Sequence, residues 1–242
     1  MMKRMIFLAL VGMATVASGA DNKRVWTDPV KAKAEDPGFA VQGEYGRKAA
    51  GTQVVALGDG QFYISAYNGG LPGAGWDGSD PVTSTGDEAV VRAATEGMKM
   101  MERTSPTLGR VAPDGAVVLV DGKANDLVKG EVRDGVLWAG AQTTGEYGSF
   151  SLHVEFRLPY KPGVAPSSQD RGNSGLYLHN RYEVQVLDSF GLIYDREKIG
   201  LPAKSDPKQW CACLYRFKTA DVPMCLPPLQ WQTYDIEFTA AK

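Results

Sequence analysis

Residues 149–158 read S-F-S-L-H-V-E-F-R-L, a run in which polar and apolar side chains alternate without interruption. A period of two is typical of a β-strand that buries one face and leaves the other face polar. The predicted buried face consists of Phe150, Leu152, Val154, Phe156 and Leu158. The opposite face brings together His153, Glu155 and Arg157. This run therefore predicts both a core and a polar surface.

Further strand signals follow along the chain. Residues 174–179 (S-G-L-Y-L-H) and 182–188 (Y-E-V-Q-V-L-D) flank Asn180-Arg181 and predict a hairpin, and residues 231–238 (W-Q-T-Y-D-I-E-F) predict the last strand. The 28 Gly and 14 Pro residues indicate many turns. We therefore expect an all-β protein, with a β-sandwich that is incomplete at the C-terminus because no closing strand follows residue 238.

The first twenty residues have the composition of a secretory signal. Lys3 and Arg4 precede an apolar run over residues 6–17, and residues 18–20 (S-G-A) supply the small residues of a cleavage site. The apolar run is shorter than the roughly 20 residues that cross a bilayer. We predict that residues 1–20 are a signal peptide, that no transmembrane segment follows, and that the protein is exported to the periplasm or the extracellular space.

The remaining chain divides into three predicted parts. Residues 21–38 form a polar N-terminal extension, and residues 39–108 form a small β-rich module. The module contains one hairpin around the turn at residues 58–60 and a second hairpin over residues 89–103, for which a helix over residues 87–103 is the alternative. Residues 109–242 form the sandwich domain.

Charge and cysteine content restrict the partners. A formal net charge of −2, from 26 basic and 28 acidic side chains, gives no reason to expect nucleic acid. Either Cys211 or Cys213 can form a disulfide with Cys225 in an exported protein. The short spacing of Cys211 and Cys213 does not fit a zinc site, and no calcium loop occurs. We predict no cofactor and no metal site, although a divalent ion near the acidic residues is compatible with the sequence.

Polar faces of the predicted strands carry the candidate site. Glu183 and Gln185 point to one face, Asp188 joins them only through a β-bulge, and Glu155 is expected to line the same face from a nearby strand. Two carboxyl groups across a glycosidic bond are the usual hydrolytic pair. The predicted catalytic residues are Glu183, Glu155 and Asp188. The predicted substrate-binding residues are Arg157, Asn173, Tyr177, His179 and Gln185. A solvated face without function is the alternative for Glu155 and Arg157.

Several of these stretches resemble the 3-keto-disaccharide hydrolase family. They are F-S-L-H-V-E-F-R-L-P (150–159), R-G-N-S-G-L-Y-L (171–178), Y-E-V-Q-V-L-D-S-F-G (182–191) and W-Q-T-Y-D-I-E-F (231–238). Residues 39–109, with G-G-L-P-G-A-G-W-D-G at 69–78, resemble the N-terminal module of long exported members from planctomycete-like bacteria. The resemblance implies a concanavalin-like jelly-roll sandwich that is truncated at the C-terminus. It also implies that Cys211 and Cys225 form the disulfide, because members tend to have Gly in place of Cys213.

The resemblance further implies cleavage of glycosides whose sugar is oxidised at carbon 3. A keto group there acidifies the proton on carbon 2, so cleavage can proceed by elimination and hydration. The strand at 183–188 is also similar to the catalytic strand of laminarinase-type glucanases, but Gln185 replaces its middle acid and argues against a two-carboxylate retaining mechanism. We therefore expect an exported hydrolase or lyase that binds carbohydrate. The alternatives are a lectin-like module that binds without cleavage and an adhesion protein that binds through residues 39–105.

Overall fold

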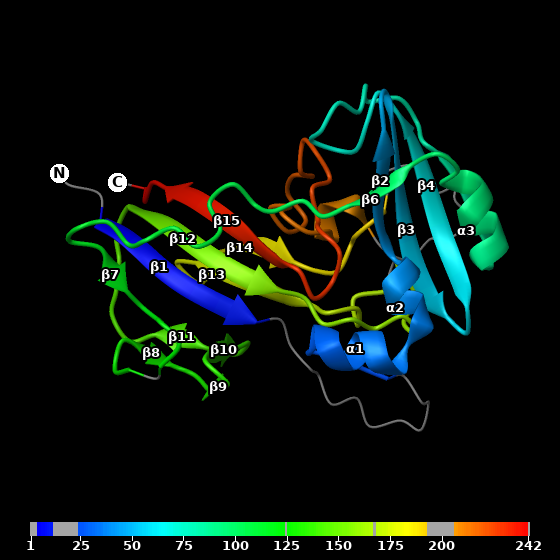
Figure 1. The fold of residues 1–242 in the computed structure, drawn as a ribbon. Coiled ribbons are helices and arrows are strands. Elements are labelled where there is room, and N and C mark those ends of the chain that lie inside the picture. The colour runs from blue at the N-terminus through cyan, green and yellow to red at the C-terminus, as the bar shows by residue number, and fades with distance from the viewer. Residues whose placement is uncertain (1–3, 12–23, 124, 167, 193–205, 242) are drawn as a thin grey trace.

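The computed structural model describes residues 4–11, 24–123, 125–166, 168–192 and 206–241 (Figure 1). Strands predominate over helices within these ranges, which confirms the predicted all-β class. The strands are β1 (Arg4–Val11), β2 (Gly43–Arg47), β3 (Ala50–Gly58), β4 (Gln61–Asn68), β5 (Val82–Gly86), β6 (Lys99–Met101), β7 (Val117–Val118), β8 (Val128–Lys129), β9 (Val132–Arg133), β10 (Val136–Trp138), β11 (Gln142–Thr143), β12 (Phe150–Arg157), β13 (Ser174–Leu178), β14 (Tyr182–Val186) and β15 (Trp231–Phe238). The helices are α1 (Pro29–Glu35), α2 (Pro37–Val41), α3 (Glu88–Ala94) and a short 3-10 helix at Pro207–Gln209.

The larger layer of the sandwich is a sheet with the order β15-β12-β1-β10-β9, in which β7 also pairs with β1. The alternating run near residue 150 forms β12, which pairs antiparallel with β15 from Phe150↔Phe238 to Arg157↔Trp231. The apolar side chains of β12 are buried, as the period of two predicts. Strand β12 thus gives the sheet a core face and an outer face.

The smaller layer contains the β13–β14 hairpin, which packs on the core face of the large sheet (Figure 1). Leu176, Leu178 and Val186 from the hairpin share one hydrophobic core with the apolar side chains of β12. The hairpin turns at His179 and Asn180, and both have a φ of 52°, as in the tight turns that match the twist of paired strands. The two layers form the predicted jelly-roll-like sandwich.

Strand β1 differs from the other strands because all of its pairings are parallel. It lies between β12 and β10, with Arg4 opposite Phe150 and Leu10 opposite Leu137. Part of the predicted signal peptide is therefore a central strand of the large sheet. The predicted cleavage site at Ala20 lies outside the described residues.

A second sheet, with the order β5-β4-β3-β2-β6, forms the N-terminal module. Ala32 of α1 and Val91 of α3 pack with Val54 on one face of this sheet. Val55 and Tyr63 on its other face belong to the core of the sandwich. The hydrophobic core is thus continuous from the module to the sandwich, and the division at residue 108 stays a prediction.

Aspartate residues explain three helices that differ from the sequence-based expectations. Asp28 and Asp36 accept hydrogen bonds from backbone amides at the starts of α1 and α2, and Pro29 and Pro37 occupy the first helical positions. The predicted polar extension is therefore helical in part. Asp87 caps α3 in the same way, so the predicted second hairpin is wrong in its first half and the alternative helix is present. No helix among the described residues is long and apolar enough to cross a membrane.

Candidate functional site

The outer face of the β13–β14 hairpin carries a row of three polar side chains. Tyr177 lies opposite Glu183 in the hairpin register. On the other side of β14, the amide of Tyr215 donates to the carbonyl of Glu183 at 2.9 Å, and Val184 forms an antiparallel bridge with Leu214. Because directly opposed residues project to the same face of a sheet, Tyr177, Glu183 and Tyr215 stand in line across three neighbouring segments.

The Glu183 carboxylate lies over a residue without a side chain. A Cβ atom on Gly175 would be 2.2 Å from Oε1 of Glu183, so only glycine leaves room for this carboxylate position. Glu183 is partly exposed and forms no ion pair with any residue that the structure describes. The site thus contains an accessible carboxylate that is not neutralised by a neighbouring cation.

Tyr177 is the exposed partner of this carboxylate, with 62% of its surface accessible. Partial burial raises the pKa of Tyr177, and its hydrogen bond to Glu183 and the charge of Glu183 raise the pKa further. The phenol therefore stays protonated at neutral pH and remains a hydrogen-bond donor. The hairpin therefore places a phenol donor, Tyr177, beside a carboxylate acceptor, Glu183.

A cluster of three side-chain amides lies next to Glu183. Nε2 of Gln185 donates to Oδ1 of Asn173 at 3.2 Å and to Oε1 of Gln169 at 3.3 Å. Gln185 is fully buried, whereas Asn173 and Gln169 are partly exposed. Oε1 of Gln185 and Nε2 of Gln169 have no hydrogen-bond partner among the described residues. Gln185 therefore holds the side chains of Asn173 and Gln169 in place, and both residues are partly exposed, although Nε2 of Gln169 is itself buried.

Three buried cysteines lie near this cluster. The predicted disulfide between Cys211 and Cys225 is not formed in the structure. Cys211, Cys213 and Cys225 are all buried and unbridged. Sγ of Cys211 is 2.9 Å from the hydroxyl of Tyr234, which also donates to the carbonyl of Gln185 at 2.7 Å. Burial raises the pKa of Cys225. Hydrogen bonds with Cys225 and Tyr234 lower the pKa of Cys211, and the burial of both thiols limits access for an oxidant.

Asp188 does not join the row on the hairpin. Strand β14 ends at Val186 without the β-bulge that would bring Asp188 to the face of Glu183. Instead, Oδ2 of Asp188 accepts a hydrogen bond from Nε of Arg171 at 2.7 Å, and only 1% of either side chain is exposed. Burial raises the pKa of Asp188, while the charge of Arg171 opposes this shift. Asp188 thus lies in a buried ion pair.

Glu155 lies on the opposite side of the sandwich from Glu183. Both residues point away from the common core, but they project from different layers, so the structure corrects the expectation that they share a face. Oε1 of Glu155 accepts from the amide of Gly109 at 2.5 Å and lies 3.4 Å from Nε2 of His153. His153 is fully buried, and its Nδ1 is 2.8 Å from Oδ1 of Asp235.

The segment at residues 107–110 covers this second polar face. Thr107 donates to Asp235 at 2.6 Å, and Arg110 forms an ion pair with the same carboxylate at 3.0 Å. Arg157, further along β12, donates to the carbonyl of Thr27 at 2.8 Å and lies with its guanidinium 5.2 Å from the ring centre of Trp231. The polar groups of this face therefore bind one another and the covering chain.

His179 occupies the hairpin turn and not the polar row. Its positive φ breaks the alternation that was expected to align it with Tyr177. Nε2 of His179 is 2.7 Å from the carbonyl of Tyr147, and its ring centre is 4.6 Å from that of Phe238.

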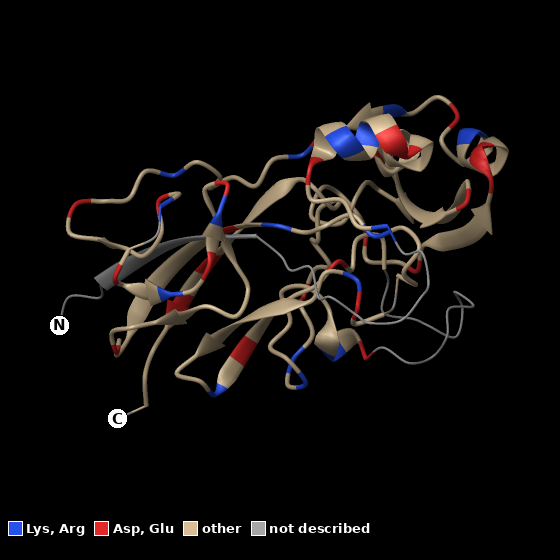
Figure 2. Cartoon of the chain, turned by 90° about the horizontal axis from the view of Figure 1, so that it is seen from below, with Lys and Arg blue, Asp and Glu red and all other residues tan. Residues whose placement is uncertain are grey.

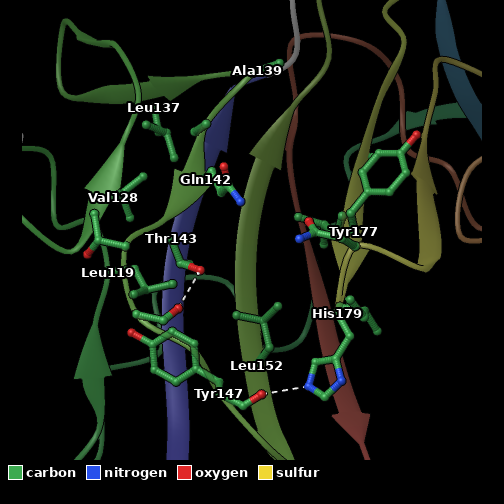
Figure 3. Close-up of a pocket in the computed structure, with 18 of the residues that line it drawn as sticks. Leu119, Val128, Leu137, Ala139, Gln142, Thr143, Tyr147, Leu152, Tyr177 and His179 are labelled. Carbon is green, nitrogen blue, oxygen red and sulfur yellow. Dashed lines mark hydrogen bonds between the residues drawn. The ribbon is translucent and has the colours of Figure 1, made fainter. Parts of the chain in front are cut away.

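A cavity of about 610 Å³ lies on the core side of β13 (Figure 3). Leu119, Leu137 and Leu152 form much of its wall, and Gln142 and Thr143 project into it. Tyr177 contributes to the lining, but Figure 3 shows its ring directed away from the leucine side chains. The described lining contains none of the three predicted catalytic acids. Because Glu183 lies outside this lining, we evaluate the outer face of the hairpin as the candidate for chemistry.

Lys and Arg residues are interspersed with Asp and Glu residues along the described part of the chain (Figure 2). No group of three or more His, Cys, Asp or Glu side chains that could hold a metal ion occurs in the ranges given above.

Of the eight catalytic and substrate-binding residues predicted from the sequence, the structure places Glu183, Gln185, Asn173 and Tyr177 near one another. Sequence reasoning missed Tyr215 and Gln169. Tyr215 follows no alternating pattern, and only its backbone pairing with β14 shows that it belongs to the row. A tyrosine close to three cysteines gave no signal of its own.

Two comparisons with known proteins found matches. The 3-keto-alpha-glucoside-1,2-lyase-like domain family matches residues 65–242, well over half of the chain, and the match begins inside β4. A crystal structure of a proposed glycosyl hydrolase from Parabacteroides distasonis ATCC 8503 matches at 28% sequence identity with a TM-score of 0.44. That match covers 54% of this chain and 56% of the other chain. No curated protein matches.

Proposed function

Because the chain belongs to the 3-keto-alpha-glucoside-1,2-lyase-like domain family, we propose that it cleaves the glycosidic bond of sugars oxidised at carbon 3. The observation that carries the proposal is the accessible Glu183 carboxylate, which lies beside the protonated phenol of Tyr177. Such a pair supplies a base and an acid within one row of the sheet. Glu155 and Asp188, which bind partners of their own, are not needed for this chemistry.

The reaction begins at carbon 2 of the oxidised sugar. The carbon 3 carbonyl acidifies the carbon 2 proton, and Glu183 removes this proton to form an enolate. The enolate electrons then form a double bond between carbon 1 and carbon 2, and the bond from carbon 1 to the glycosidic oxygen breaks. Water adds across the new double bond to give the free 3-keto sugar. No external oxidant or reductant is required.

Tyr177 acts as the general acid for the leaving group. Its phenol donates a proton to the departing glycosidic oxygen and recovers one from the protonated Glu183, which lies opposite it in the hairpin. The two side chains then return to their starting states. Asn173 is partly exposed and presents an amide group that can pair with a sugar hydroxyl, and buried Gln185 positions it.

The test uses methyl 3-keto-α-glucoside and methyl α-glucoside with the full chain in D2O. We expect release of methanol and incorporation of deuterium at carbon 2 only from the oxidised sugar, because only its carbon 2 proton is acidic. Cleavage of both glycosides at similar rates would indicate ordinary hydrolysis. Saturable binding of the oxidised sugar without any product would support the lectin-like alternative and contradict the proposal.

We also propose that residues 1–20 direct export, which is supported by the basic start, the apolar run and the small residues before position 21. The exported protein should begin near Asp21. N-terminal sequencing of protein recovered outside the cytoplasm tests this, and an intact start at Met1 would contradict it.

A further inference from the structure

An elimination from a 3-keto sugar needs a third group besides a base and an acid. Negative charge develops on the carbon 3 oxygen when the carbon 2 proton leaves, and a donor near that oxygen lowers the barrier. The preceding mechanism assigns Glu183 to carbon 2 and Tyr177 to the oxygen on carbon 1. We therefore expect a hydrogen-bond donor on the segment that pairs with the other edge of β14, so that Glu183 lies between this donor and Tyr177.

Tyr215 occupies that side. Its amide donates to the Glu183 carbonyl at 2.9 Å, and the amide of Gln185 donates to the carbonyl of Cys213 at 3.0 Å. These bonds flank the bridge between Val184 and Leu214 and set Tyr215 directly opposite Glu183. Neighbouring strands are about 4.8 Å apart, so the row spans roughly 10 Å between the outer backbones. Long tyrosine side chains can converge from both sides on one sugar ring.

Other contacts support an ordered and accessible position for Tyr215. The side chain is partly exposed, and it interacts electrostatically with Tyr177 across Glu183. The guanidinium of Arg216 lies 5.3 Å from the ring centre of Tyr215. The amide of Arg216 donates to the carbonyl of Lys208 at 2.9 Å, which anchors the segment that carries Tyr215.

We propose that Tyr215 is a catalytic residue that donates a hydrogen bond to the carbon 3 oxygen and stabilises the enolate. This inference rests on the proposed function. The row Tyr177, Glu183, Tyr215 then matches the order of the glycosidic oxygen on carbon 1, the proton on carbon 2 and the carbonyl on carbon 3. Each of the three neighbouring segments thus supplies one side chain that contacts one reacting group of the same sugar ring.

Two phenylalanine variants separate the steps. Tyr215→Phe removes only the donor for the enolate, so deuterium exchange at carbon 2 and cleavage of methyl 3-keto-α-glucoside should both fall about 100-fold, with KM nearly unchanged. Tyr177→Phe removes the acid for the leaving group, so cleavage should fall while carbon 2 exchange continues. Phe217→Leu is the matched control, because Phe217 lies in the same segment, is 69% exposed and is outside the row.

The outcomes are distinct. Wild-type exchange and cleavage rates in Tyr215→Phe would overturn the assignment of Tyr215 and leave the proposed function intact. A fall in cleavage with normal carbon 2 exchange in this variant would also overturn it, because enolate formation would then not depend on Tyr215. A wild-type protein without exchange or cleavage would refute the proposed function, and this inference with it.

Discussion

The two outer faces of the sandwich share the same alternating sequence pattern, but their glutamates lie in different environments. Each contains a strand on which glutamate alternates with apolar residues, namely Glu155 on β12 and Glu183 on β14. On β12, the carboxylate accepts a backbone hydrogen bond from Gly109, and neighbouring His153 is paired with Asp235. On β14, Glu183 contacts Tyr177 and lies over Gly175.

The difference shows what alternation can and cannot predict. A period of two indicates which side chains leave the core, but it does not indicate whether another segment will cover them. Buried polar groups that are fully paired contribute to stability and specificity of packing, whereas accessible groups with spare hydrogen-bonding capacity can bind a ligand. We therefore expect the β12 face to affect stability and the β14 face to affect activity.

The largest expected effect comes from the same substitution at the two glutamates. Glu183→Gln should lower the turnover of a 3-keto-glycoside about 10²- to 10⁴-fold, because the general base is lost. Glu155→Gln should stay within a few-fold of wild type. Steady-state kinetics on both variants provide the measurement. Equal losses would remove the functional distinction between the two faces.

A stability comparison gives the next largest effect. His153→Ala should lower the free energy of unfolding by about 2 kcal/mol or more, because it removes a fully buried side chain together with its hydrogen bond to Asp235. Tyr177→Ala, at a 62% exposed position, should change it by about 0.5 kcal/mol or less. Urea unfolding measures both values, and a reversed order would contradict the assignment.

A smaller effect is expected at Gly175. In Gly175→Ala the added Cβ would approach Oε1 of Glu183 to 2.2 Å, so the carboxylate must move from its position. We expect turnover to fall about tenfold, since small displacements of a catalytic group reduce rates strongly. Gly148→Ala is the control, because nothing lies within 4 Å of its Cβ position. Unchanged turnover in Gly175→Ala would mean that the carboxylate position is not important for the reaction.

The smallest expected effect is a dependence of stability on acid at the β12 face. Burial alone would raise the pKa of Asp235, but the hydrogen bonds from Thr107 and His153 and the charge of Arg110 lower it below the ordinary value. A lowered pKa stabilises the fold above the ordinary Asp pKa of about 4, and this contribution is lost as pH falls through the lower native pKa. Urea unfolding from about pH 5 to pH 3 should therefore show a shallower loss of stability in Asp235→Asn than in wild type. Parallel curves would argue against the pairing.

Much of the fold could be predicted from local patterns. Period-two alternation located β12, β15 and the β13–β14 hairpin, because each has one buried face. Helices α1 and α2 were missed although their capping signals were present, since Asp28 before Pro29 and Asp36 before Pro37 are typical helix starts. The polar character of the extension was given more weight than these local signals.

The candidate site could be predicted only within one hairpin. Glu183 and Tyr177 share a face because they are close in sequence and opposed in a β-hairpin. Glu155 was misplaced because alternation gives the side of a strand and not the layer to which the strand belongs. Tyr215 could not be found, since its position depends on backbone hydrogen bonds between β14 and a segment without a regular pattern.

Strand β1 has a consequence for the order in which the chain is made. Arg4 is synthesised early, but its partner Phe150 leaves the ribosome only after the intervening residues have been translated. Pairing of such distant segments is slow to form. If the secretion machinery captures residues 1–20 during this delay, the sheet must form without the strand that separates β12 from β10. If residues 1–20 direct export, as proposed, the eight residues of β1 cannot also serve as a central strand of the large sheet.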